Sequence, residues 1–264
     1  MIWPFWSGRK LLALPGRTPA ELVDYFRDTR HPVASLLVVV PLLALYEATV
    51  AGISADGRAS PRNGADAWIR NLVPELGQSS THLPPLAIIV VLTILVIPRW
   101  RDFPSRWGTL CFGLVAECLG WSLALWGLSL GWPGIVKNSG VELSWFDRAA
   151  PQFASLTPLI GAGIYEEFLF RLVALGVLNG LASLIGVGGL AGWMVAAVVS
   201  SWFFGAVHHW GPQGQQYSAL LFSFRFFAGL GLCFLTRYRG FSIAVGTHFL
   251  YNLIIGLRPM FATP

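Results

Sequence analysis

The chain has little charge and no long polar stretch. Only 12% of its 264 residues are Asp, Glu, Lys or Arg, and 55% are hydrophobic. A typical soluble domain carries about 25% charged residues, about twice the share found here. A soluble domain also needs at least about 50 residues, and no stretch of more than about 30 residues here lacks a candidate membrane span. The composition therefore excludes a soluble protein with a single anchor. It predicts an all-α fold: a polytopic bundle of about seven or eight transmembrane helices, whose ionisable residues we expect to line a polar intramembrane cavity.

Other missing features narrow the chemistry. The three cysteines, Cys111, Cys118 and Cys233, lie inside apolar runs and show no Cys-x-x-Cys spacing, which argues against a disulfide framework and a zinc–cysteine site. His-Glu-x-x-His, the helix motif of common zinc proteases, is absent. No basic run is interleaved with aromatic residues, so the net charge of +5 does not indicate a nucleic-acid partner. The first ten residues have no apolar core, so we expect no cleaved signal peptide.

Apolar runs divide the chain into three parts. Residues 1–31 form a basic N-terminal segment with a predicted amphipathic helix near 19–27, and a plain solvated helix is the alternative there. Residues 32–150 hold N-terminal spans and loops, including a second interfacial segment near 65–73. Residues 151–264 hold the predicted catalytic core. The expected spans are 32–53, 83–97, 107–130, 153–178, 190–208, 217–235 and 241–257, with room for a re-entrant or eighth segment within 176–192.

Basic residues predict the orientation in the membrane. With the N-terminus inside, ten Lys or Arg residues fall on the inner side and six on the outer side. This excess predicts an integral protein of the cytoplasmic (plasma) membrane, with a cytoplasmic N-terminus and an external C-terminus. His208 would then lie close to the outer face, and a cavity beside it would open outward.

The stretch from Gly161 to Arg171 concentrates charge inside an apolar segment. It contains Glu166, Glu167 and Arg171, and ionisable groups inside a span are functional candidates because a charge in hydrocarbon costs at least about 2.5–3.5 kcal/mol. Glu167 and Arg171 are spaced i, i+4 with the acid first, so they are expected to pair. Glu166 gains no partner from its own helix, which suits a general base. The alternative is that all three form a structural ion-pair cluster.

Two further polar groups follow on later spans. Phe204 precedes His208 by one helical turn, and His248 precedes Asn252 by the same spacing. His209 is expected to be interfacial or structural, and an ordinary interhelical His–Asn hydrogen bond is the alternative for the last pair.

A carboxylate, two imidazoles and an amide are the groups that water-mediated amide hydrolysis needs. Glu166, His208 and His248 could instead hold a zinc ion with its bound water.

These three motifs, Glu-Glu-x-x-x-Arg, Phe-x-x-x-His and His-x-x-x-Asn, resemble those of the CPBP (Abi) family of intramembrane proteases. That family includes the type II CAAX prenyl endopeptidases and bacterial bacteriocin-processing and immunity proteins, and the resemblance covers about residues 159–257. It implies that Glu166 and His208 activate water and that His248 and Asn252 stabilise the oxyanion. Glu167 and Arg171 would order the first group, with Phe204 in support. Leu172 stands where many members have Gly.

The resemblance implies an endopeptidase that acts on a membrane-tethered protein substrate in the bilayer, with a lipidated or C-terminally anchored chain as the expected kind of substrate. No cofactor is expected, and zinc is the alternative. A non-catalytic immunity or scaffold protein of the same fold is the second hypothesis. A proton-coupled transporter is the third, although the halves of the chain show no inverted repeat. Arg225, a further cation inside a span, is expected to pair with Glu47 or Glu117, or to contact a substrate carboxylate.

Overall fold

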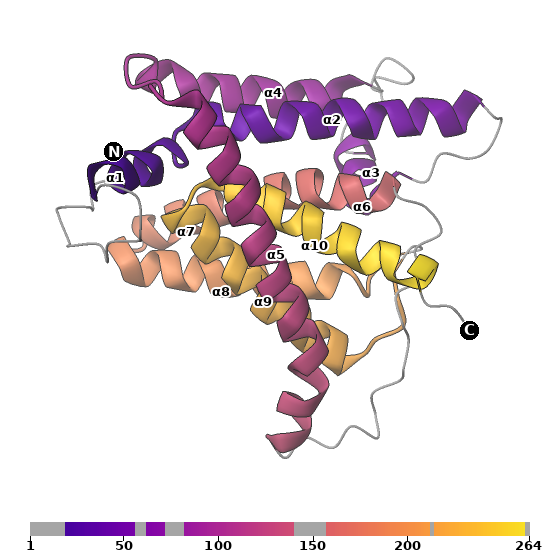
Figure 1. Ribbon diagram of the computed structural model, residues 1–264. Helices are drawn as coiled ribbons and strands as arrows, with labels where there is room; N and C mark the ends of the chain where they lie inside the picture. Colours follow the sequence, from indigo (N-terminus) through magenta and orange to yellow (C-terminus); the bar gives the residue numbers. More distant parts are fainter. Residues whose placement is uncertain (1–18, 56–61, 72–81, 140–156, 212–213, 262–264) are drawn as a thin grey trace.

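The computed structural model describes residues 19–55, 62–71, 82–139, 157–211 and 214–261, and every regular element in these ranges is a helix (Figure 1). Five helical segments in this part of the chain are long and apolar enough to cross a membrane, and two shorter apolar helices accompany them. The predicted class, a helical integral membrane protein, is confirmed. The five long segments are α2 (Pro32–Ala55), α5 (Trp107–Asn138), residues 157–184, α8 (Gly189–Val207) and α9 (Ala219–Tyr238); the shorter helices are α4 (Leu83–Val96) and α10 (Phe241–Phe261).

Helix α4 shows how these segments divide between bundle and lipid. Ile88 and Leu92 are 1% exposed and belong to the core beside α2. Leu86, Val90 and Ile94, at spacing four on another face, are each more than half exposed. Large apolar side chains exposed along a whole helix face would be a liability in water, and in a bilayer they contact acyl chains of like polarity.

The segment that carries the two glutamates is wound differently from the expected α-helix. It begins as α6 (Thr157–Gly161), continues as two π-helical stretches, η4 (Ala162–Glu166) and η5 (Phe168–Ala174), and ends as α7 (Leu175–Leu184). Such wide turns are rare and occur frequently at functional sites. A Cβ atom on Gly163 would lie 2.8–2.9 Å from Cβ and backbone atoms of Phe249, so glycine is what allows η4 to approach α10 this closely.

Some expected boundaries shift. Helix α5 continues eight residues past the expected end at residue 130, and α7 continues to Leu184. A turn of four residues then leads into α8, so the region 176–192 holds no re-entrant or eighth segment. The first part of the span predicted from residue 153 lies outside the described residues. The predicted amphipathic segment forms α1 (Pro19–Asp28).

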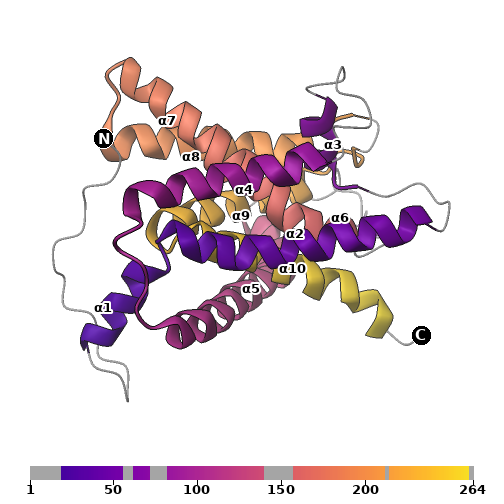
Figure 2. The same ribbon diagram turned by 90° about the horizontal axis from the view of Figure 1, so that it is seen from above.

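Helix α3 (Gly64–Asn71) is packed into the protein rather than lying free at its surface. Ala65 and Asp66 are buried, and the helix contacts η4 and α4. In both ribbon views α3 and α1 lie at opposite ends of the molecule, and α3 lies near α6 (Figures 1 and 2). The segment between the first two spans therefore contributes to the end of the bundle where the glutamates begin.

Candidate active site

Glu166 and Glu167 are consecutive residues, and each faces a different histidine. Oε1 of Glu167 lies 2.7 Å from Nδ1 of His248 and 3.2 Å from Nη1 of Arg171. Glu167 is fully buried, and Arg171 is 3% exposed. The predicted i, i+4 ion pair is confirmed, and His248 joins it from α10.

Glu166 contacts two residues from other parts of the chain. Its Oε1 accepts a hydrogen bond from Nδ2 of Asn63 at 3.0 Å, and its Oε2 lies 3.7 Å from Nε2 of His208. The second distance is too long for a direct hydrogen bond, and Oε2 has no hydrogen-bond partner among the described residues. One carboxylate oxygen of Glu166 is therefore held, and the other faces an imidazole across a gap.

The contact between His208 and the α8 backbone determines which ring nitrogen carries the proton. Nδ1 of His208 lies 2.6 Å from the carbonyl oxygen of Phe204. A carbonyl can only accept, so Nδ1 is the donor, and in the neutral ring Nε2 is an acceptor. Nε2 of His208 and Oε2 of Glu166 are then two acceptors that face each other.

The Phe204 ring lies between the two acid–histidine pairs. Its centroid is 5.0 Å from that of His208 and 5.9 Å from that of His248, with edge-to-face geometry in both cases. The guanidinium carbon of Arg171 lies 4.2 Å from the same centroid, a cation–π distance. Phe204 is 4% exposed. One buried ring thus contacts both histidines and the arginine, which agrees with the supporting position predicted for it.

A cavity of about 310 Å³ lies beside Glu166 and His208. Its walls come from α3, η4, η5, the end of α8 and the connection to α9. The lining residues are Gly64, Ala65, Ala67, Trp68, Asn71, Glu166, Phe170, Val207, His208, Trp210, Gly211 and Gln215.

His248 and Asn252 are not among the residues that line this cavity. His248 is 6% exposed and bonded to Glu167, and Nδ2 of Asn252 lies 3.5 Å from the carbonyl oxygen of Leu159, at the outer limit of a hydrogen bond. Of the four predicted catalytic side chains, Glu166 and His208 therefore line the cavity, His248 is bonded to the buried Glu167, and Asn252 contacts the backbone of Leu159.

The expected ion pairs of Arg225 are wrong. Glu117 is paired with Arg239, whose Nε and Nη2 atoms each lie 2.6 Å from a carboxylate oxygen. Glu47 lies 3.6 Å from Arg62 and from Arg70. Acids elsewhere in the bundle thus already have partners.

Arg225 instead donates from Nη2 to Oε1 of Gln215 at 2.6 Å. Its Nη1 is buried and has no hydrogen-bond partner among the described residues. Gln215 lines the cavity, so this cation lies just behind the cavity wall.

His209 lies outside the cavity lining, as expected for a structural histidine. Its ring lies 5.2 Å from that of Tyr217, and its Nδ1 lies 3.3 Å from the carbonyl oxygen of Gln215. Burial lowers the pKa of His209. The residue therefore helps to shape the connection from α8 to α9 that forms one cavity wall.

The alternative zinc ligands are not assembled into a metal site. In the described ranges no three His, Cys, Asp or Glu side chains converge in a ligating arrangement. Glu166 and His208 could supply two ligands, and His248, whose Nδ1 is engaged by Glu167, could add a third only through Nε2. All three cysteines are free, and Cys118 and Cys233 are buried.

Two contributors to the site carry no recognisable sequence pattern. Asn63 lies in the polar segment after the first span, and Gln215 lies in the connection after α8. Neither belongs to an apolar helix with a regular spacing, so only the folded arrangement identifies them.

The fold and the site together define a helical membrane protein with a catalytic-type acid–imidazole pair facing a cavity. Residues 149–254 match the family model described as type II CAAX prenyl endopeptidase Rce1-like. The matched region contains Glu166, Glu167, His208, His248 and Asn252, and the chain is similar to that family over this region. No curated protein and no solved structure matches the chain.

Proposed function

We propose that this protein is an intramembrane endopeptidase in which Glu166 activates a water molecule to hydrolyse a peptide bond. The observation that carries the proposal is the 3.7 Å separation between Oε2 of Glu166 and Nε2 of His208, two facing acceptors. A water molecule that enters from the cavity and moves the two atoms slightly apart would donate one hydrogen to each, and this would orient a lone pair of its oxygen toward the cavity. A carboxylate within hydrogen-bond reach of the water is the geometry that general-base catalysis requires.

The reaction then proceeds in two proton-balanced steps. Glu166 accepts a proton as the water oxygen bonds to the substrate carbonyl carbon, which forms a tetrahedral oxyanion. The carbon–nitrogen bond then breaks, and the proton passes to the leaving amine from Glu166 directly or through His208. The immediate products are a carboxylic acid and an amine, and Glu166 is restored as a carboxylate; the new carboxylic acid then gives its proton to the amine, which leaves as an ammonium group.

The group around Glu167 has a supporting role in this mechanism. His248 uses Nδ1 for Glu167, so its Nε2 donates to an oxyanion only when the ring is protonated. Asn252, one helical turn further along α10, would supply a second donor to the oxyanion.

The substrate in this proposal is a membrane-tethered protein. The cavity lies at the α3 end of the bundle, so with a cytoplasmic N-terminus it would open to the outer side of the membrane. Arg225, with a free Nη1 behind Gln215, would contact a substrate carboxylate. Prenylated peptides that end in Cys-aliphatic-aliphatic-Xaa are the first probe to test, because the description of the matched family model names that motif.

Comparative membrane proteomics of cells with wild-type protein and with Glu166→Gln tests the proposal. Gln keeps the size of Glu but cannot accept the proton, so a substrate terminus that is trimmed in the wild type should stay intact in the variant. The amount of variant protein in the membrane, measured in parallel, must match the wild type. Unchanged termini at equal protein level would favour a scaffold or immunity protein of the same fold instead.

A further inference from the structure

Asn63 is bonded to the candidate base although it lies far from the predicted motifs in sequence. Its Nδ2 donates to Oε1 of Glu166 at 3.0 Å, across 103 positions of the chain, and it lies outside the matched region 149–254. We propose that Asn63 is a positioning residue for the hydrolysis: its amide holds Oε1, so that Oε2 of Glu166 faces His208 and the attacking water. This inference rests on the proposed function.

The orientation of the Asn63 amide follows from its other contacts. Its Oδ1 accepts a hydrogen bond from the backbone N–H of Ala65 at 2.8 Å, so the NH₂ group must lie on the opposite side. There Nδ2 meets two acceptors, the Glu166 carboxylate and the carbonyl oxygen of Pro158 at 3.4 Å. Every hydrogen-bonding atom of this side chain has a suitable partner, and Asn63 is 6% exposed. The amide is thus held in one orientation toward Glu166.

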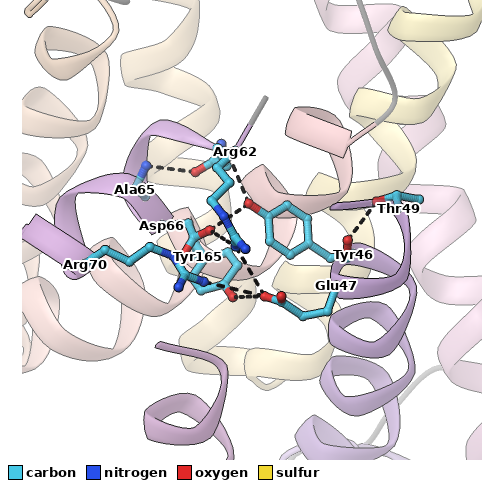
Figure 3. A network of polar contacts seen from close by, with 9 residues as sticks. Tyr46, Glu47, Thr49, Arg62, Ala65, Asp66, Arg70 and Tyr165 are labelled. Atoms are coloured by element: carbon cyan, nitrogen blue, oxygen red, sulfur yellow. Dashed lines mark hydrogen bonds and ion pairs between the residues drawn. The ribbon is translucent and has the colours of Figure 1, made fainter. Parts of the chain in front are cut away.

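A buried network anchors Asn63 to α2. The backbone N–H of Asn63 donates to the Tyr46 hydroxyl at 3.1 Å, and that hydroxyl donates to Asp66 at 2.8 Å. Asp66 is fully buried and also accepts from Arg62 at 3.0 Å and from Arg70 at 2.8 Å (Figure 3). The polar contacts of α3 therefore hold the residue immediately before this helix at a fixed place.

The packing of α6 against this network is equally tight. A Cβ atom on Gly161 would lie 2.6 Å from the Tyr46 ring and 2.7 Å from Cβ of Asn63. Real Cβ atoms do not approach that closely, so only glycine lets both residues pack on the helix that continues to Glu166. The short distance between Asn63 and Glu166 is therefore produced by helix packing as well as by hydrogen bonding.

A held carboxylate matters because the base must act on one water molecule in one geometry. Misplacement of a catalytic group by about 1 Å can lower a rate by about a hundredfold. Without the Asn63 amide, Glu166 could rotate and turn either oxygen toward other donors. Removal of the amide should therefore slow the chemical step and leave substrate binding unchanged.

The kinetic test compares Asn63→Ala and Asn63→Asp with Thr49→Ala in purified protein. The Thr49 hydroxyl donates to the backbone carbonyl of Tyr46 at 2.7 Å. Its variant therefore disturbs α2, the helix that anchors Asn63, without removing a contact of Glu166. The probe is a farnesylated peptide that ends in Cys-aliphatic-aliphatic-Xaa or, if the wild type does not cleave it, the trimmed protein found by proteomics. We expect kcat to fall about tenfold to a hundredfold for Asn63→Ala, with KM and Tm near wild type.

Asn63→Asp should be slower still, because a second carboxylate would repel Glu166, and Thr49→Ala should keep wild-type kcat. An unchanged kcat for Asn63→Ala would overturn the proposal. So would a loss that appears only in KM or in protein level, since that is the result of a structural role.

A second measurement tests the contact without any substrate. Selective ¹⁵N labelling of asparagine in micelles reports the side-chain amide of Asn63, assigned by its absence in Asn63→Ala. We expect Glu166→Gln to shift this signal and Thr49→Ala, the control variant, to leave it in place. If the chemical shift of the Asn63 amide does not change in Glu166→Gln, the inference is overturned, whatever the activity of the variants. If the signal responds but no terminus depends on Glu166, the proposed function fails and the positioning role fails with it, while the hydrogen bond stands.

Discussion

His248 approaches Glu167 to 2.7 Å, while the preceding residue, Glu166, turns to His208. The two acids thus have different surroundings although they are neighbours in sequence. Glu167 is fully buried, and its Oε1 contacts both Arg171 and His248, whereas its Oε2 has no hydrogen-bond partner among the described residues. Glu166 borders the cavity and keeps one oxygen free. This division separates a structural carboxylate from one that can react, and it leads to the first prediction.

Removal of the charge should affect mainly stability at Glu167 and only activity at Glu166. Glu167→Gln leaves the buried Arg171 without a counter-charge, which typically destabilises by about 3–5 kcal/mol. We expect a clear loss of Tm and of membrane protein level for this variant. Glu166→Gln should keep wild-type Tm and lose activity. Thermal unfolding in detergent and peptide cleavage measure the two effects, and equal Tm losses would contradict the division.

Gly163 should tolerate no side chain. The added methyl group of Gly163→Ala would meet Cβ and backbone atoms of Phe249 at 2.8–2.9 Å and would push η4 away from α10. Overpacking of this kind costs about 1–3 kcal/mol, and it should also lengthen the contact between Glu167 and His248. Gly176→Ala is the matched control, because no atom lies within 4 Å of a Cβ at that exposed helical position. Its Tm should be unchanged or slightly higher. Similar Tm values for both variants would mean that the helices are not in close contact.

Arg225 should select substrates that carry a carboxylate near the cleaved bond. The test uses two peptides that differ only in a C-terminal carboxylate or carboxamide. Wild-type protein should cleave the carboxylate peptide with about tenfold or higher kcat/KM, since one charge-assisted hydrogen bond contributes about 1.5–3 kcal/mol. Arg225→Gln should remove this preference, mainly through KM for the carboxylate peptide. A preference that survives the substitution would assign the recognition to another residue.

Chelators should leave the activity intact. The proposed reaction uses the Glu166 carboxylate as the base, and the described residues assemble no ligand set for a metal ion. Wild-type protein treated with 1,10-phenanthroline and then freed of it by gel filtration should cleave at the untreated rate. A loss of activity that added zinc restores would instead assign the water to a metal ion.

Much of the fold follows from local patterns. Apolar runs of about 20 residues predict the spanning helices, because a bilayer leaves few other ways to satisfy the backbone. Spacing along one helix also predicts the Glu167–Arg171 pair, since residues four apart lie on one face. The π-helical winding of residues 162–174 was not predicted, because it depends on how closely α10 approaches Gly163.

The arrangement of the site residues also depends on contacts between helices, which local sequence patterns do not predict. The resemblance of three motifs indicated Glu166, His208, His248 and Asn252, and the structure places the first two, but not the last two, on the cavity. The expected partners of Arg225 were wrong, because partner choice between helices depends on their order in the bundle, which composition does not contain.

The sequence by itself determined that this is a helical membrane protein and which of its charged residues lie within apolar segments, because hydrophobicity and helical periodicity are local properties. Only the tertiary structure decided that Glu166 faces His208, that Glu167 binds His248, and that Asn63 reaches Glu166 from a segment about a hundred positions away. Contacts of this kind depend on distances between helices, and those distances are set by the packing of the whole bundle.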